Sequence, residues 1–193
     1  MAEGVNNISL LLTAVRFCAE RHRRQRRKDA EATPFVNHPI EVAELLWHVG
    51  EVRNTRVILA ALLHDILEDT ETQPEEIEER FGKEVLRLVL EVTDNRSLPK
   101  RHRKRLQIEL APKLSPGARK IKIADKICNV RDLTLSPPPD WSWEDRWEYL
   151  EWTEKVVAGL RGVDPVLEAI YDEVIGEGKR KTAAEKPPDP IRG

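Results

Sequence analysis

Seven consecutive apolar residues, 57–63, lead directly into His64 and Asp65. The whole segment 54–67 is apolar on nearly every side, so the sequence predicts one central helix that is buried all round. Charged groups at the end of such a helix are costly to bury unless they are paired or bind a metal. The fold must therefore supply enough neighbouring helices to surround this segment. Its polar end is either an exit to solvent or a site.

Apolar residues recur at helical spacing along most of the chain, and no convincing strand alternation or repeat is present. A capping box between Thr72 and Glu75 predicts a short helix that runs through Phe81. We expect the other helices over residues 10–18 and on into 21–28, from Pro39, and over 83–93, 100–110, 118–133, 141–160 and 165–175. The sequence thus predicts an all-α fold of about eight to ten helices, with a domain over residues 1–176 and a flexible tail over 177–193.

Composition narrows the class of protein. Lys and Arg number 32 and Asp and Glu 34, a formal net charge of −2, which gives no support for a nucleic-acid partner. Cys18 and Cys128 lie far apart without metal-type spacing, so we expect no disulfide. We find no signal peptide and no apolar run of the roughly 18 residues that span a bilayer. We expect a soluble, cytoplasmic protein with no membrane partner, and the sequence leaves its oligomeric state open.

The polar end of the central segment carries His64, Asp65, Glu68 and Asp69. On a helix these residues would be neighbours three or four positions apart. A His-Asp pair alone is a weak signal, and a helix end emerging into solvent explains it equally well. Two further residues favour a site, because His38 begins a helix after a loop and Asp125 lies among core positions. Together, His38, His64, Asp65 and Asp125 form a mixed imidazole–carboxylate set that suits Mn²⁺, Fe²⁺, Zn²⁺ or Co²⁺.

Three motifs occur in a fixed order: FVNHPI, ALLHDILEDT and IKIADKICNVRDL. In this order and at these separations they resemble the HD-domain hydrolases of the (p)ppGpp type. The similarity is greatest to the small stand-alone alarmone hydrolases related to the metazoan SpoT homologue, and it runs from about residue 10 to 175. The resemblance implies a compact HD-domain helical bundle. Because the chain ends before any synthetase domain, we do not expect it to synthesise the alarmone.

The resemblance also implies roles for individual residues. His38, His64, Asp65 and Asp125 would bind one divalent metal, usually Mn²⁺ in this family, and Glu68 and Asp69 would be the acidic pair needed for hydrolysis. The implied substrate-binding residues are Arg27, Lys28, Asn129, Lys100 and Tyr149. Phe35 departs from the family, which often has tyrosine there, and the register of Asp145 and Arg146 cannot be carried over.

The implied activity is metal-dependent hydrolysis of the 3′-diphosphate of (p)ppGpp, which gives GDP or GTP and diphosphate. Elementary chemistry agrees, because a metal can acidify water and bind a phosphoryl oxygen, and Glu68 or Asp69 can orient or deprotonate that water. The same site acting on the 2′-phosphate of NADPH is the nearest alternative. A non-catalytic module that senses the alarmone is a second alternative. Nucleic-acid binding through the basic segment 21–28 is a third, although we interpret that segment mainly as a solvated helix end.

Overall fold

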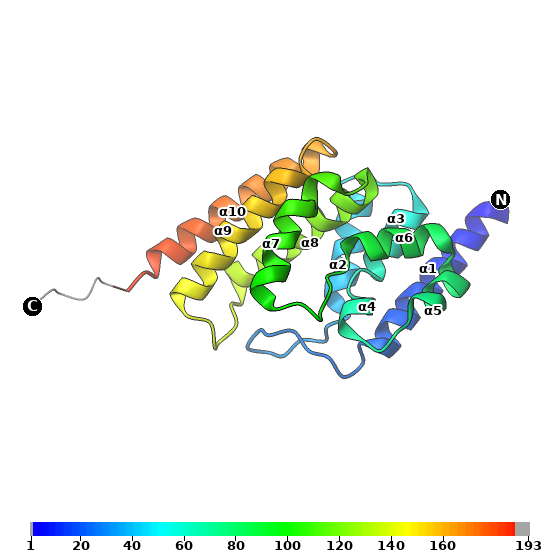
Figure 1. The fold of residues 1–193 in the computed structure, drawn as a ribbon, viewed down its shortest axis with the longest axis horizontal. Helices are drawn as coiled ribbons and strands as arrows, with labels where there is room; N and C mark the ends of the chain where they lie inside the picture. Colours follow the sequence, from blue (N-terminus) through cyan, green and yellow to red (C-terminus); the bar gives the residue numbers. More distant parts are fainter. Residues whose placement is uncertain (1, 188–193) are drawn as a thin grey trace, which may run out of the picture.

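The computed structural model describes residues 2–187, with side chains from residue 7 onward, and this part of the chain is helical (Figure 1). The helices in chain order are α1 Ala2–Arg21, α2 Asn37–His48, α3 Thr55–Leu62, α4 Ile66–Asp69, α5 Pro74–Phe81, α6 Lys83–Val92, α7 Lys100–Leu110, the 3₁₀ helix η1 Ala111–Lys113, α8 Pro116–Leu135, α9 Trp143–Leu160 and α10 Pro165–Ala184. Within the described residues the only β pairing is a single bridge between Arg26 and Pro34. The predicted all-α fold is confirmed.

Helix α8 lies at the centre of the bundle. It packs against α2, α3 and α6 on one side and against α9 and α10 on the other (Figure 1). Ser115 caps its first turn by accepting a hydrogen bond from the amide of Ala118. The predicted core positions of this helix are all buried: Ile121, Ile123, Ala124, Ile127 and Val130. A side chain on α8 can therefore face elements from both halves of the molecule.

The central apolar segment is buried as predicted, but it is not one helix. All seven residues from 57 to 63 are buried, yet α3 ends at Leu62 and α4 begins only at Ile66. The amides of Leu63 and His64 bond to carbonyls three residues back, at 3.2 and 3.5 Å. The Nδ1 atom of the His64 ring forms a hydrogen bond of 2.7 Å with the Ala61 carbonyl. In a continuous helix this carbonyl would instead accept a hydrogen bond from the amide of Asp65. The predicted continuous helix over 54–67 is wrong for this reason.

The basic segment 21–28 also differs from its predicted form. Helix α1 ends at Arg21, and the chain then turns, with Arg26 bridged to Pro34 and the amide of Arg27 bonded to the Thr33 carbonyl at 2.9 Å. The segment is therefore the start of a folded loop rather than a solvated helix end. This loop connects α1 to α2 and brings its side chains to the same face as α4.

Two smaller predictions are wrong in their boundaries. The capping box of α5 is formed by Gln73 and Glu76, one residue later than expected, because Pro74 occupies the first helical position. Helix α10 continues to Ala184, so residues 177–184 are helical and not a flexible tail. Gly178 and Thr182 are buried, and the Trp143 indole donates to the Thr182 carbonyl at 2.6 Å. The last predicted tail residues, 188–193, lie outside the described residues.

Neither cysteine forms a disulfide, and both are buried. Of the helices in the described part of the chain, none combines the length and the apolar character needed to cross a membrane.

Candidate active site

The four predicted metal ligands come from three elements and meet in the interior. His38 lies on the first turn of α2, His64 and Asp65 lie in the turn between α3 and α4, and Asp125 lies on α8. The His38 Nε2 is 3.1 Å from Asp125 Oδ1 and 3.9 Å from Asp65 Oδ2. The His64 Nε2 is 3.0 Å from Asp65 Oδ2 and 3.8 Å from Asp125 Oδ1. Both imidazoles thus face the same two carboxylates.

The orientation of these groups fits a divalent cation. The Ala61 carbonyl fixes the Nδ1 of His64, so the Nε2 is turned toward the carboxylates, where it is buried without a hydrogen-bond partner. Such an outer hydrogen bond on one ring nitrogen is what metal-binding histidines usually have. Ligand atoms of His38, His64 and Asp65 all lie within 4.8 Å of one another. An ion among these atoms would satisfy the free ring nitrogen and neutralise the buried carboxylates.

The pKa values of the cluster also fit a site for a divalent cation. Burial opposes a charge on His64, but Asp65 and Asp125 outweigh it and raise the pKa of His64 to about 9. Burial likewise opposes ionisation of Asp125, yet Lys126 and the two histidines hold the pKa of that carboxyl well below its usual range. The carboxylates therefore keep a proton on the imidazole, and a cation that binds here displaces it.

Lys126 is a site residue that sequence reasoning missed. It is 5% exposed, and its ammonium donates to Asp125 Oδ2 at 3.0 Å and lies 4.8 Å from the centroid of the Trp152 ring. Asn129 donates to the other oxygen, Oδ1, at 2.5 Å. Asp125 is thus held on both oxygens. The available signal was a lysine directly beside Asp125 among the apolar positions of α8.

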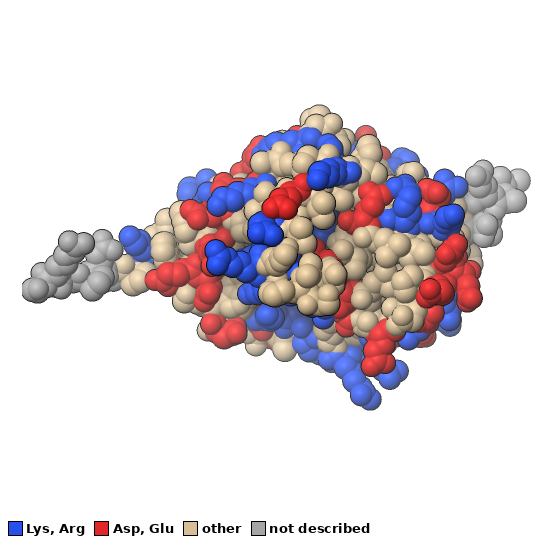
Figure 2. Space-filling view, viewed as in Figure 1, with Lys and Arg blue, Asp and Glu red and all other residues tan. Residues whose placement is uncertain are grey.

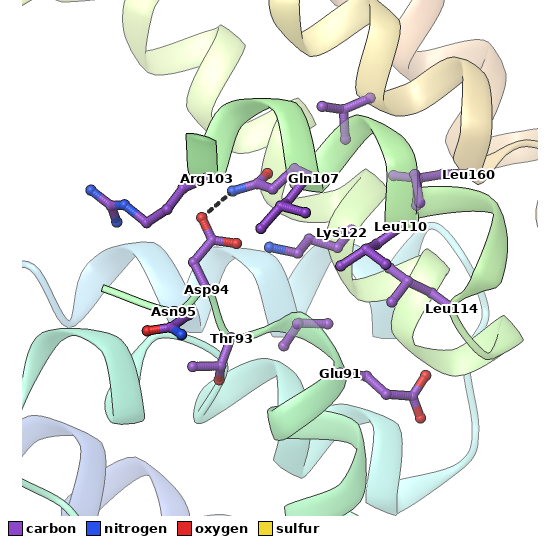
Figure 3. A pocket seen from close by; sticks show the side chains of 14 residues that line it. Glu91, Thr93, Asp94, Asn95, Arg103, Gln107, Leu110, Leu114, Lys122 and Leu160 are labelled. Atoms are coloured by element: carbon purple, nitrogen blue, oxygen red, sulfur yellow. Dashed lines mark hydrogen bonds between the residues drawn. The ribbon is translucent and has the colours of Figure 1, made fainter. Parts of the chain in front are cut away.

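Glu68 of α4 is directed toward the residues that follow α6 and toward α7. The backbone amide of Asp94 donates to its Oε2 at 3.1 Å, and an Arg103 nitrogen lies 3.7 Å from its Oε1. Burial is the main reason that the pKa of Glu68 rises to about 7. Asp94 is itself held by Gln107 at 2.6 Å, beside a largely apolar cavity of about 180 Å³ (Figure 3). Glu68 can therefore exchange a proton near neutral pH.

Asp69 has a different environment. Gln25 donates to its Oδ2 at 2.7 Å, and the guanidinium of Arg96 pairs with its Oδ1. Gln25 in turn contacts His22, so the carboxylate is connected to the loop that follows α1. The two acids are thus held by different partners, and their role as the acidic pair needed for hydrolysis stays a prediction.

The predicted substrate-binding residues line a cleft beside the metal cluster. Arg27 donates to Asn129 at 2.9 Å and to Asp132 at 2.5 Å, which links it through Asn129 to Asp125. Two cavities of about 300 and 850 Å³ share Lys28, Tyr149 and Trp141 in their walls. Phe35, Arg27 and Asn129 line the smaller cavity, and Lys100 lines the larger.

The walls of the cleft carry charges of both signs, since eight Lys or Arg and seven Asp or Glu line the two cavities. Lys100, Arg101 and Lys104 of α7 line the larger cavity, together with the acidic residues Asp140, Asp145 and Glu148. Figure 2 shows Lys and Arg along the lower edge of the view, where the α1–α2 loop lies. The uncertain register at the start of α9 also becomes clear. Asp145 lines the larger cavity, whereas Arg146 pairs with Glu185 at 2.6 Å and does not line either cavity. The lysine ammonium groups of the cleft suit the phosphates of a ligand, and the rings of Trp141 and Tyr149 suit a planar group.

Similarity to known proteins identifies the family of this chain. Residues 14–151 match the family model described as an HD domain, and the chain belongs to this family. Among its relatives are proteins named guanosine-3′,5′-bis(diphosphate) 3′-pyrophosphohydrolase MESH1. The Xenopus tropicalis protein is 49% identical over 169 residues, 88% of this chain and 94% of the relative. The Homo sapiens protein is 52% identical over 158 residues, 82% and 88% of the two chains.

A solved structure is also similar to this chain. It is described as a metazoan ortholog of SpoT that hydrolyses ppGpp. The two structures match with a TM-score of 0.85 and 45% sequence identity, and the match covers 87% of this chain and 94% of the other chain. The resemblance stated from the three motifs is therefore confirmed.

Proposed function

We propose that this chain is a metal-dependent guanosine-3′,5′-bis(diphosphate) 3′-diphosphohydrolase, which degrades (p)ppGpp to GDP or GTP and diphosphate. The observation that carries the proposal is the buried cluster of His38, His64, Asp65 and Asp125 beside a cleft that lysines and aromatic side chains line. The names of its relatives and the description of its structural neighbour support the choice of substrate.

The donor set supports Mn²⁺ as the cofactor, held by His38, His64, Asp65 and Asp125. Two imidazoles and two carboxylates suit Mn²⁺ and other first-row divalent ions better than Mg²⁺ or Ca²⁺. When bound, such an ion acidifies a water molecule and neutralises charge on a phosphoryl oxygen. Lys126 and Asn129 hold Asp125 by its two oxygens, and the Ala61 carbonyl holds His64, so the ligand atoms remain in place.

The acidic pair supplies the proton chemistry. Glu68 has a pKa of about 7 because it is buried, so at neutral pH it can accept a proton or donate one. Asp69 accepts hydrogen bonds from Gln25 and Arg96 and offers a carboxylate of fixed orientation to an attacking water. Proton transfer of this kind typically contributes 10²–10⁴-fold to a rate.

The cleft residues bind the nucleotide. Lys28 and Lys100 offer positive charge to its phosphates, while Arg27, Asn129 and Tyr149 line the wall beside Phe35. We propose a nucleotide substrate and no nucleic-acid or membrane partner. We also propose a cytoplasmic location, which the buried free cysteines and the balanced charge support. The functional domain extends to Ala184, because α10 packs against α8 and α9 up to its end.

The proposal is tested by turnover of purified protein. Diphosphate release from ppGpp is measured with Mn²⁺ and with excess chelator, and NADPH is assayed in parallel as the alternative substrate. We expect hydrolysis of ppGpp that the chelator abolishes and that His64→Ala reduces by at least about 100-fold. His48→Ala is the matched control, because His48 lies exposed at the end of α2. No diphosphate release by the Mn²⁺-loaded wild type would refute the substrate, and an active His64→Ala would refute the metal site.

A further inference from the structure

The basic segment 21–28 contains two residues that are neither Lys nor Arg, His22 and Gln25. Both turn toward the interior, whereas most of the basic side chains around them are exposed. His22 is only 2% exposed, and its ring packs on Phe35 with 4.8 Å between the ring centroids. The role proposed above for Arg27 and Lys28 does not account for the inward orientation of His22 and Gln25.

The two side chains form a directed chain of hydrogen bonds to Asp69. The His22 Nδ1 is 2.7 Å from Gln25 Oε1, and the Gln25 Nε2 is 2.7 Å from Asp69 Oδ2. An amide has its acceptor at one end and its donors at the other. If His22 carries its proton on Nδ1, Gln25 must present its NH₂ group to Asp69. The reverse orientation would place the amide oxygen against the carboxylate.

The position of Asp69 makes this series of hydrogen bonds important. Asp69 is the last residue of α4, a helix of only four residues, so its own element restrains it weakly. Its other side-chain partner, Arg96, lies in the segment between α6 and α7 and has a side chain that is 56% exposed. Gln25 is half-buried and fixed at both ends of its amide, so it is the more rigid of the two partners.

We infer that Gln25 is the positioning residue for Asp69, and that His22 fixes the orientation of Gln25. This inference rests on the proposed function of Asp69 and extends it into the segment before Arg27. Gln25 lines the smaller cavity beside Asp69, but its amide is engaged at both ends by His22 and Asp69, and His22 lines neither cavity. The two residues keep the carboxylate at the angle at which it can orient water, so their loss changes turnover rather than binding.

The kinetic test uses Gln25→Met, which keeps the length of the side chain and removes both hydrogen bonds. We expect kcat for ppGpp to fall about 10- to 100-fold, the effect of a misplaced catalytic group, with KM changed less than about twofold. Arg24→Met is the matched control, because Arg24 is an exposed neighbour in the same segment. His22→Phe keeps the packing on Phe35, and combined with Gln25→Met it should add nothing, because both residues act through Asp69.

The decisive test combines Gln25→Met with Asp69→Asn. In the Asp69→Asn variant, Gln25→Met should have no further effect on kcat. An additional fall in kcat would show that Gln25 acts elsewhere, and a wild-type kcat for Gln25→Met in the otherwise native chain would overturn the inference. If the wild type itself does not hydrolyse ppGpp, it is the proposed function that fails.

A second measurement needs no turnover and no variant. Long-range ¹⁵N NMR of the wild-type protein in chelator reports which nitrogen of the His22 ring carries the proton. We expect a proton on Nδ1. A neutral ring protonated only on Nε2 would overturn the inference, because Gln25 would then present its oxygen to Asp69.

Discussion

The carboxyl group of Glu68 couples the proton balance of the site to the stability of the fold. Its pKa rises from 4.5 to about 7, chiefly because it is buried. In metal-free protein at pH 5–7 the native state therefore holds a proton that the unfolded chain releases. Stability must fall as the pH rises through this range, since the native state binds more protons than the unfolded state.

Glu68→Gln should remove this pH dependence, because glutamine does not titrate. In chelator, we expect the free energy of unfolding of the wild type to fall relative to that of the variant, by up to about 3 kcal/mol between pH 4.5 and 8. Urea denaturation of both proteins at several pH values measures the difference. Parallel pH profiles for the two proteins would contradict the assigned pKa.

Lys126 has a structural role that can be separated from chemistry. It neutralises Asp125 in the interior, and removing one partner of a buried pair leaves an uncompensated charge. We expect Lys126→Met to lower the free energy of unfolding of metal-free protein by about 3 kcal/mol. Excess Mn²⁺ should restore part of the loss, because the ion also neutralises Asp125. Lys155→Met, on the exposed face of α9, is the control and should change stability by less than about 0.5 kcal/mol.

At the level of secondary structure, periodicity predicted burial better than it predicted boundaries. The apolar run before His64 identified the most buried segment, and the core positions of α8 are those that the spacing indicated. The break after Leu62 was not predictable in this way, because it depends on a bond between the His64 ring and a backbone carbonyl. The end of α10 was missed because Gly176 and Gly178 suggested a flexible segment, whereas Gly178 is buried in a helix contact.

The two glycines of α10 provide a matched test of that contact. A Cβ at Gly178 would lie 2.9 Å from Thr134 Oγ1, a hydroxyl that is held by the Val130 carbonyl, while a Cβ at Gly176 would meet only a flexible arginine at 3.6 Å. Gly176→Ala should therefore stabilise the protein by about 0.5–1 kcal/mol through helix propensity. Gly178→Ala should destabilise it by about 1 kcal/mol, because overpacking outweighs that gain. Thermal unfolding distinguishes them, and equal stabilisation would show that this end of α10 does not pack on α8.

For the whole molecule, the motifs predicted which residues meet better than they predicted how these residues are held. His38, the adjacent pair His64 and Asp65, and Asp125 are far apart in the sequence and converge in the interior. Gln25 and Arg96 act on Asp69 through contacts between distant elements, and no local spacing records such contacts. Lys126 lies directly beside Asp125 in the sequence, but its burial depends on elements packed against α8. Single-sequence reasoning therefore found the candidate ligands and missed most of their supports.

Because its proposed ligands come from α2, the α3–α4 turn and α8, a bound ion would connect three elements of the native state only. Mn²⁺ at 100 times its Kd should add about 2.7 kcal/mol to the free energy of unfolding, and chelator should reverse the gain. The melting temperature measured across a Mn²⁺ titration reports this effect. His64→Ala should show almost no Mn²⁺-dependent rise, and a rise as large as that of the wild type would place the ion elsewhere.

The carbonyl that orients His64 belongs to the backbone of Ala61, and every amino acid has that group. A single codon change can delete the supports that Lys126 and Gln25 provide, but none can delete this one. In a saturation library, position 61 should therefore respond only to side-chain volume, since Ala61 is fully buried. Variants with glycine or serine at position 61 should pass a selection for activity. Positions 25 and 126 should tolerate only side chains that keep the hydrogen-bonding group or the charge of the native residue. The support of His64 is thus the one that mutation cannot remove.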